Sequence, residues 1–143
     1  MAVLGSDIMI DMHVTADTDV DSIRGAVLEN SRLNPALAGD LRRAIEETTT
    51  DVLHNHGITD CSLTVDLQFR DERVPGAPRE RIDARLDVEG EESLLASVDG
   101  AVDAPERARI AEATEAFLKE HLADEGLNDV VETTVIVTPV QFR

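Results

Sequence analysis

Lysine is almost absent from this 143-residue sequence, and cysteine, tryptophan and tyrosine are equally scarce. Cys61 is the single cysteine, which excludes an internal disulfide and gives no sign of an oxidising compartment. No apolar run approaches the ~20 residues that a membrane helix requires. The beginning, MAVLGSDIMIDM, lacks the basic region of a signal peptide. These absences predict a soluble, intracellular protein.

Acidic residues dominate the charge of the chain. Thirty carboxylates against thirteen basic residues, of which only Lys119 is lysine, give a net charge of -17. Such a surface repels itself in dilute buffer but is tolerated in high salt, because the Debye length falls to about 3 Å at 1 M. The composition is typical of a salt-loving, haloarchaeal protein; the alternative is an acidic mesophilic protein with a codon bias that favours arginine. Either origin disfavours nucleic acid and anionic membranes as partners, because phosphate binding needs clustered Lys and Arg.

The segment 61–88 predicts a long β-hairpin around which the rest of the chain is organised. CSLTVDLQF and RIDARLDV each alternate apolar and polar residues, and the turn-rich DERVPGAPR separates them. The apolar residues of each arm share one face and the polar residues share the other. The hairpin therefore needs a cover on one side only.

The flanking segments supply helices for that cover and further strands. Residues 7–14 alternate as a first strand, a short helix begins near residue 20, and Asn34 with Pro35 begins a second helix that Gly57 ends. SLLASV, at 93–98, is expected to form a short third strand before the turn pair Asp99-Gly100. A helix capped by Asp103 and Glu106 runs to about residue 125. A final strand, lying inside the sheet or against a partner, covers DVVETTVIVTPVQFR, with Pro139 at an edge or bulge.

This order predicts one α+β domain over 1–143. Its sheet is small, antiparallel or mixed, and built on the hairpin, with helices mostly on one face and the order β-α-α-β-β-(β)-α-β. The sequence contains no repeat, low-complexity tract or linker that would divide the chain.

Two groups of residues carry metal-ligand chemistry. Asp17, Asp19 and Asp21 have the spacing of a calcium loop, but the glycine and glutamate that an EF-hand requires further on are absent, so helix capping is the favoured interpretation. His54 and His56, near Cys61, are zinc-ligand types. In a helix the two histidines point about 200° apart and suit its C-terminus, so we predict no metal and no cofactor here.

The same segment, LRRAIEETTTDVLHNHG, resembles a helix of GHKL-type ATP-binding anti-sigma factors and histidine kinases. In that family a Glu precedes a magnesium-binding Asn by four residues; Glu47 matches the Glu, and Asp51 stands where the Asn is expected. The DxGxG and GxGLG boxes of the family have no counterpart in this sequence. A nucleotide-binding regulator or a small metal-binding protein that uses residues 47–61 is therefore the alternative function.

Arginines are concentrated around the hairpin. Five of the twelve lie within sixteen residues: Arg70, Arg73, Arg79, Arg81 and Arg85. This is the one region able to dock against the acidic surface of a neighbouring copy, since a guanidinium pairs with carboxylates bidentately. Cross-strand charge pairing on a solvated face is the equal alternative.

In the order of its elements the chain resembles small head-to-tail joining and tail-completion proteins of tailed viruses, including tail terminators. The resemblance rests on DTDVDSIRGAVLENSRLNPALAGDLRRAIEETTTDVL as a paired helix region before a hairpin, and on VETTVIVTPVQFR as a last strand. It implies a structural, non-catalytic subunit that forms homo-oligomeric rings in high salt, contacts neighbouring structural proteins, and ends in a virion. The sequence identifies no catalytic residues, so we predict that the protein is not an enzyme.

Overall fold

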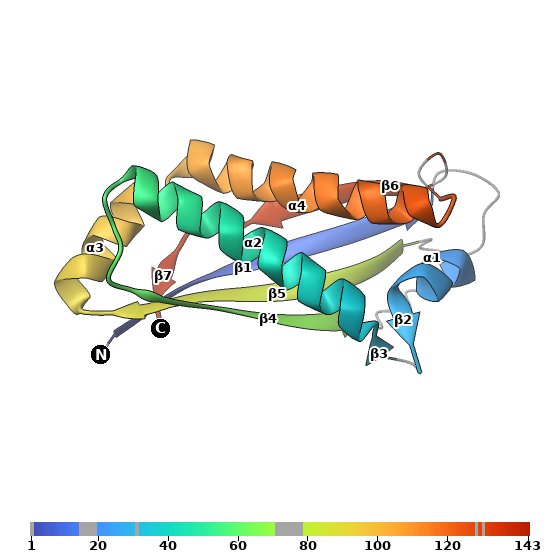
Figure 1. The fold of residues 1–143 in the computed structure, drawn as a ribbon, viewed down its shortest axis with the longest axis horizontal. Helices are drawn as coiled ribbons and strands as arrows, with labels where there is room; N and C mark the ends of the chain where they lie inside the picture. Colours follow the sequence, from blue (N-terminus) through green and yellow to red (C-terminus); the bar gives the residue numbers. More distant parts are fainter. Residues whose placement is uncertain (1, 15–19, 31, 71–78, 128, 130) are drawn as a thin grey trace.

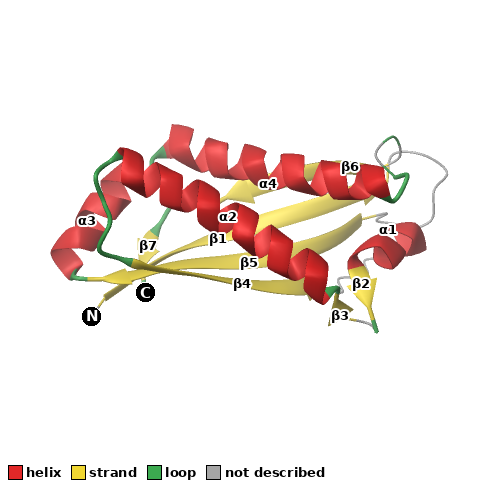
Figure 2. Cartoon of the chain, in the orientation of Figure 1, coloured by secondary structure: helices red, strands yellow, loops and turns green. Residues whose placement is uncertain are grey.

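The chain folds into an antiparallel sheet with two long helices packed on one face (Figures 1 and 2). The structure, a computed structural model, describes residues 2–14, 20–30, 32–70, 79–127, 129 and 131–143. The prediction of an α+β fold with a mainly antiparallel sheet and helices on one side is confirmed. None of the helices in these residues is both long enough and apolar enough to cross a bilayer.

Four strands form the body of the sheet in the order β4-β5-β1-β6, and the short β7 pairs with the beginning of β1. All pairings are antiparallel. Counted with the two long helices, the chain order is βαββαβ with a split βαβ unit, the ferredoxin-like arrangement. The strands are β1 (Ala2–Val14), β4 (Ser62–Arg70), β5 (Arg79–Gly90), β6 (Val131–Val137) and β7 (Gln141–Phe142).

Two long helices cover the sheet and two short ones cover its ends. In Figure 1, α2 and α4 run side by side along the sheet, α3 lies at the end near both chain termini, and α1 lies at the opposite end with the small hairpin β2–β3. The elements are α1 (Val20–Val27), β2 (Leu28–Glu29), β3 (Arg32–Leu33), α2 (Pro35–Asn55), α3 (Glu92–Ala101) and α4 (Ala104–Asp124).

The ends of α2 follow the sequence signals. Asn34 Oδ1 accepts hydrogen bonds from the backbone N–H groups of Ala36 and Leu37 at 2.9 and 3.2 Å, and Pro35 occupies the first turn. At the other end Gly57 has φ +74°, which a glycine adopts without strain, and its N–H bonds to the carbonyl of His54. The predicted N-cap and glycine stop are therefore confirmed.

The core lies between the helices and the helix-facing side of the sheet. Alternate residues of β1 and β5 point into it, because successive strand residues face opposite sides. Ile8, Ile10 and Ile82 are fully buried there. Further buried side chains come from the helices: Leu37, Leu41, Ile45, Val52, Ile110, Leu118 and Leu122.

One ion pair is buried in this layer. Glu80, at the beginning of β5, has a side chain that is 2% exposed, and its Oε1 lies 2.7 Å from Nε of Arg24 in α1. The second carboxylate oxygen, Oε2, is buried without a hydrogen bond. The Arg24 guanidinium also lies over the ring of Phe69, 5.8 Å from its centre. This ion pair links α1 to β5.

The predicted third strand at 93–98 is wrong. These residues belong to α3, in which Leu95, Val98 and Ala101 are buried at helical spacing. A short apolar run does not distinguish a strand from a helix, and serine, leucine and alanine are all compatible with a helix. Asp99 and Gly100 lie within this helix, so they form no turn between strands.

The last segment divides in two. β6 ends at Val137, Pro139 follows, and β7 resumes at Gln141. Of the two placements expected for this strand, the interior of the sheet is wrong, because β6 is the outermost strand beyond β1. The strands with two neighbours are β1 and β5, which explains why their helix-facing residues are the most deeply buried.

Candidate interaction face

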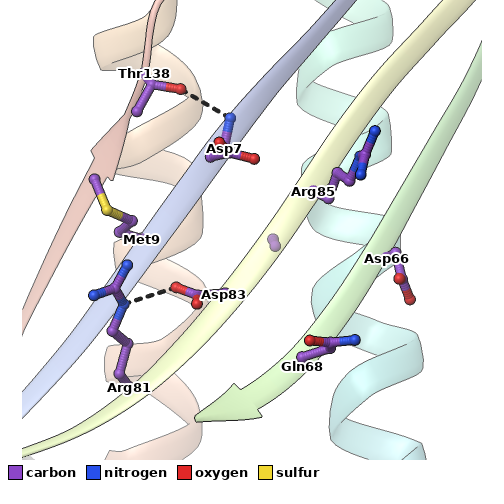
Figure 3. A pocket seen from close by; sticks show the side chains of 9 residues that line it. Asp7, Met9, Asp66, Gln68, Arg81, Asp83, Arg85 and Thr138 are labelled. Atoms are coloured by element: carbon purple, nitrogen blue, oxygen red, sulfur yellow. Dashed lines mark hydrogen bonds and ion pairs between the residues drawn. The ribbon is translucent and has the colours of Figure 1, made fainter. Parts of the chain in front are cut away.

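The second face of the sheet carries polar side chains in place of helices. Figure 3 views this face, with α2 and α4 behind the strands. A depression of about 390 Å³ lies on it, lined mainly by polar residues of three strands. We call this surface the open face and define it by Asp7, Met9, Asp66, Gln68, Arg81, Asp83, Arg85 and Asp87.

The strand register sets charges of opposite sign side by side. Arg85 on β5 is opposite Asp7 on β1 and opposite Asp66 on β4, so one row alternates in sign across three strands. Its Nε lies 3.0 Å from Oδ2 of Asp87 on the same strand. Four residues earlier on β5, Nε of Arg81 lies 2.7 Å from Oδ1 of Asp83 (Figure 3). Opposite charges that are neighbours on one face stabilise a sheet modestly.

The predicted arginine cluster is only partly described. Arg81 and Arg85 lie on the open face, and their backbones belong to β5, between β4 and β1. Arg73 and the side chains of Arg70 and Arg79 lie outside the described residues. The two described arginines are therefore not at a projecting tip, because β5 pairs with β1 along its whole length. The register sets Arg85 opposite Asp7 and Asp66, but the ion pair of Arg85 is with Asp87 on its own strand, so cross-strand charge pairing stays a prediction.

Arg143 lies at one end of the open face, beside two of its aspartates. Its guanidinium lies 3.1 Å from Oδ1 of Asp7 and 3.0 Å from Oδ1 of Asp87, and the backbone N–H of Arg143 donates to the carbonyl of Val3. Oδ1 of Asp87 is buried and makes no hydrogen bond, so the nearby guanidinium compensates its charge. The side chain passes over Gly5, which it shields from solvent.

Substituting Gly5 with alanine is expected to displace the Arg143 guanidinium from its two aspartate partners. A Cβ there would meet Nε of Arg143 and Oδ1 of Asp87, so the guanidinium has to leave both carboxylates. Because exposed ion pairs contribute about 0–1 kcal/mol each, we expect a loss of about 1 kcal/mol in the free energy of unfolding. Urea denaturation measures it. In an Arg143→Ala background the same change should lose less, because only the Asp87 carboxylate then has to move away from the new Cβ. Equal losses in both backgrounds would mean that Asp87 and not Arg143 limits the space at Gly5.

The histidine segment is not gathered into a metal site. His54 and His56 are exposed at the end of α2, where the N–H of His56 bonds to the carbonyl of Leu53. Burial raises the pKa of the Cys61 thiol, and the Asp60 carboxylate raises it further. In the described part of the chain no three His, Cys, Asp or Glu side chains are grouped so that they could hold a metal ion.

Two further groups of candidate residues were predicted. Glu47 and Asp51, which carry the GHKL-like resemblance, are exposed on α2. Asp17 and Asp19 of the calcium-like spacing lie outside the described residues, as does the side chain of Asp21.

Several residues of the open face were not among the predicted site residues. Asp7, Asp66, Asp83 and Asp87 stand on the polar side of strands that alternate clearly, so periodicity alone could have found them. The sequence does not show which of these residues lie opposite one another on neighbouring strands. No local signal reveals Arg143, because its partners Asp7 and Asp87 are distant in the sequence.

Comparison with known proteins adds distant structural similarities. No family model matches the chain, and no curated protein sequence matches it. Two similar solved structures are AtUAH in complex with glyoxylate, at 13% identity and a TM-score of 0.40, and a hydantoinase/carbamoylase family amidase from Burkholderia multivorans, at 14% identity and 0.36. Each alignment covers 97% of this chain but 28% of the other, so the chain spans less than a third of those proteins.

Proposed function

We propose that the protein is a structural assembly subunit that associates with copies of itself in high salt, forming closed rings of the kind found in virus necks and tails, and that it performs no catalysis. The observation that carries this proposal is the presence of both signs of charge on the open face. The depression is lined by three aspartates and two arginines, on a chain in which carboxylates far outnumber basic residues. The two arginines give an acidic neighbouring copy groups to which it can bind.

The geometry of the charges supports contact with a second copy. Arg85 and Asp66 are exposed, and they alternate in sign with Asp7 across neighbouring strands. The acidic surface of a neighbouring copy can offer Arg85 partners of opposite charge, and bidentate arginine–carboxylate pairs are the strong form of such contacts. A head-to-tail contact of this kind, repeated around an axis, closes into a ring. Screening in molar salt removes the long-range repulsion between the acidic surfaces but acts less on pairs that become buried.

The test is the native mass by light scattering, in low salt and in molar KCl. We expect a discrete multiple of the 15.6 kDa chain in molar KCl. Arg85→Glu, which reverses the charge at the centre of the row, should weaken association at least about tenfold. The matched control is Arg109→Glu on α4, whose side chain is 48% exposed against 55% for Arg85.

Two results would refute the proposal. One is a folded monomer at both salt concentrations and at every protein concentration that can be measured. The other is an equal loss of association in Arg85→Glu and Arg109→Glu, because the effect would then reflect net charge rather than this face.

A further inference from the structure

β6 is an outer strand without the usual protection of a sheet edge. Edge strands of soluble proteins commonly carry charges, proline or a bulge that prevents pairing with another chain. In β6, Glu132 is the single charged residue, and the run 133–137, TTVIV, has neither a charge nor a proline. The chain as a whole is 30% charged. This stretch is therefore an exception on a strongly acidic molecule.

The side chains of β6 are partly uncovered. Ile136 is 50% exposed on the open face, opposite Met9. Val135 and Val137 are only partly buried on the helix-facing side. Among the described elements, β6 packs chiefly against β1 and α4, and the register places β1 on one side of it only. An edge of this composition favours the addition of another strand.

The opposite edge of the sheet differs. β4 carries the exposed Asp66 in its middle, and β3 lies against it. A charge in the centre of an edge strand and a neighbouring element are two of the devices that prevent edge pairing. The two edges are thus unequal, which favours contact of β6 with another β6 over contact of β6 with β4.

We propose that β6 pairs antiparallel with β6 of a second copy, about a two-fold axis that passes through Val135. This register sets Thr134 opposite Ile136 and Thr133 opposite Val137 of the other copy, so β-branched side chains face one another. The two residues of each pair have both even or both odd numbers, so their side chains lie on the same side of the sheet. Helix-facing side chains of one copy are therefore next to helix-facing side chains of the other. The two sheets become one, with the helices of both copies on the same side. The contact is isologous.

Charge favours this register over the one with Thr134 on the axis. With Val135 on the axis, Glu132 is opposite Thr138, and the two Glu132 carboxylates lie about 20 Å apart along the strands. That separation exceeds the Debye length of about 10 Å at 0.1 M salt, so their repulsion is screened. Moving the axis to Thr134 would place Glu132 opposite Ile136, a carboxylate against an apolar side chain.

This inference rests on the proposed function in one respect, self-association, but it uses a different surface. The first test is Ile136→Lys, with Asn55→Lys as its control. Asn55 is exposed at the end of α2, outside both the β6 edge and the open face. Both variants reduce the net negative charge equally. We expect Ile136→Lys to raise the Kd of the two-fold contact at least about tenfold, and Asn55→Lys to leave it unchanged.

The second test is disulfide trapping without Cys61. In a Cys61→Ser background, Val135→Cys should form covalent dimers under mild oxidation, since cross-strand Cα distances permit a disulfide. Thr64→Cys, on the β4 edge, should remain monomeric on a denaturing gel. If only the combination of both cysteines gives covalent multimers, β6 pairs with β4 and the inference is wrong. Faster trapping of Thr134→Cys than of Val135→Cys would overturn the register.

The two proposals fail in distinguishable ways. If Arg85→Glu dissolves the assembly while Ile136→Lys and Val135→Cys have no effect, the assembly function stands and the β6 contact is refuted. If the wild-type protein is monomeric and Val135→Cys is not trapped, both are refuted. If Val135→Cys does not fold, the comparison of Ile136→Lys with Asn55→Lys decides.

Discussion

Replacing Arg24 with methionine is expected to lower the free energy of unfolding by about 3–5 kcal/mol. The reason is the Glu80 carboxylate, which is 2% exposed and has Arg24 Nε at 2.7 Å. Its Oε2 already lacks a hydrogen bond, so the substitution leaves a buried carboxylate without its cation. A thermal unfolding experiment should give a decrease of about 10–20 °C in Tm.

The double variant Arg24→Met/Glu80→Leu separates the charge from the packing. Replacing both members of a buried ion pair with apolar residues of similar size is commonly neutral or stabilising, so most of the loss should be recovered. The contact of Arg24 with the Phe69 ring is lost in both variants and is worth about 0.5–2 kcal/mol. A single variant that loses less than about 1 kcal/mol would show that Glu80 does not depend on Arg24.

The second large effect is expected at Ile8. This residue is fully buried at the level where β1 pairs on one side with Ala84 of β5 and on the other with Val137 of β6. Ile8→Ala removes three carbons from the middle of the core and should lower the free energy of unfolding by about 2–5 kcal/mol. Urea denaturation at constant salt measures the loss.

Ile8→Val is the graded control, because it removes one methyl group and keeps the β-branched shape. It should lose about 0.5–1.5 kcal/mol. Similar losses in the two variants would mean that the site collapses around the alanine, which is difficult for a strand held on both sides. An unchanged m-value in both variants would indicate that the same surface is exposed on unfolding.

The local signals in the sequence were sufficient for most of the secondary structure. The alternation in β4 and β5 predicted the hairpin and its one-sided cover, and Asn34 and Gly57 marked the ends of α2. α3 was missed because its run of apolar residues is too short to distinguish a period of 2 from one of 3.6. In the helix, Leu95 and Val98 are three residues apart and therefore lie on the same, buried side.

The candidate site depended on information that periodicity does not contain. Alternation places Asp7, Asp66 and Arg85 on polar faces, but only the pairing of β1 with β5 brings the three into one row. The same pairing places Arg81 and Arg85 on a strand that lies between two others, whereas the sequence predicted only that they lie around the hairpin. The contact of Arg143 with Asp7 follows from the return of the chain to β1 at β7, which no local pattern predicts.

The central position of β1 has a consequence for how the protein folds as it is synthesised. β1 leaves the ribosome before its partners, which are β5, up to Gly90, and β6, up to Val137. The helix α2 and the hairpin β4–β5 can form from residues that are close in the sequence. β1 can pair only after β5 and β6 have been synthesised. Because long loops must close before such contacts stabilise the chain, we expect insertion of β1 between β5 and β6 to limit the folding rate. An apolar strand that emerges early and pairs late is the segment for which chaperones compete during synthesis.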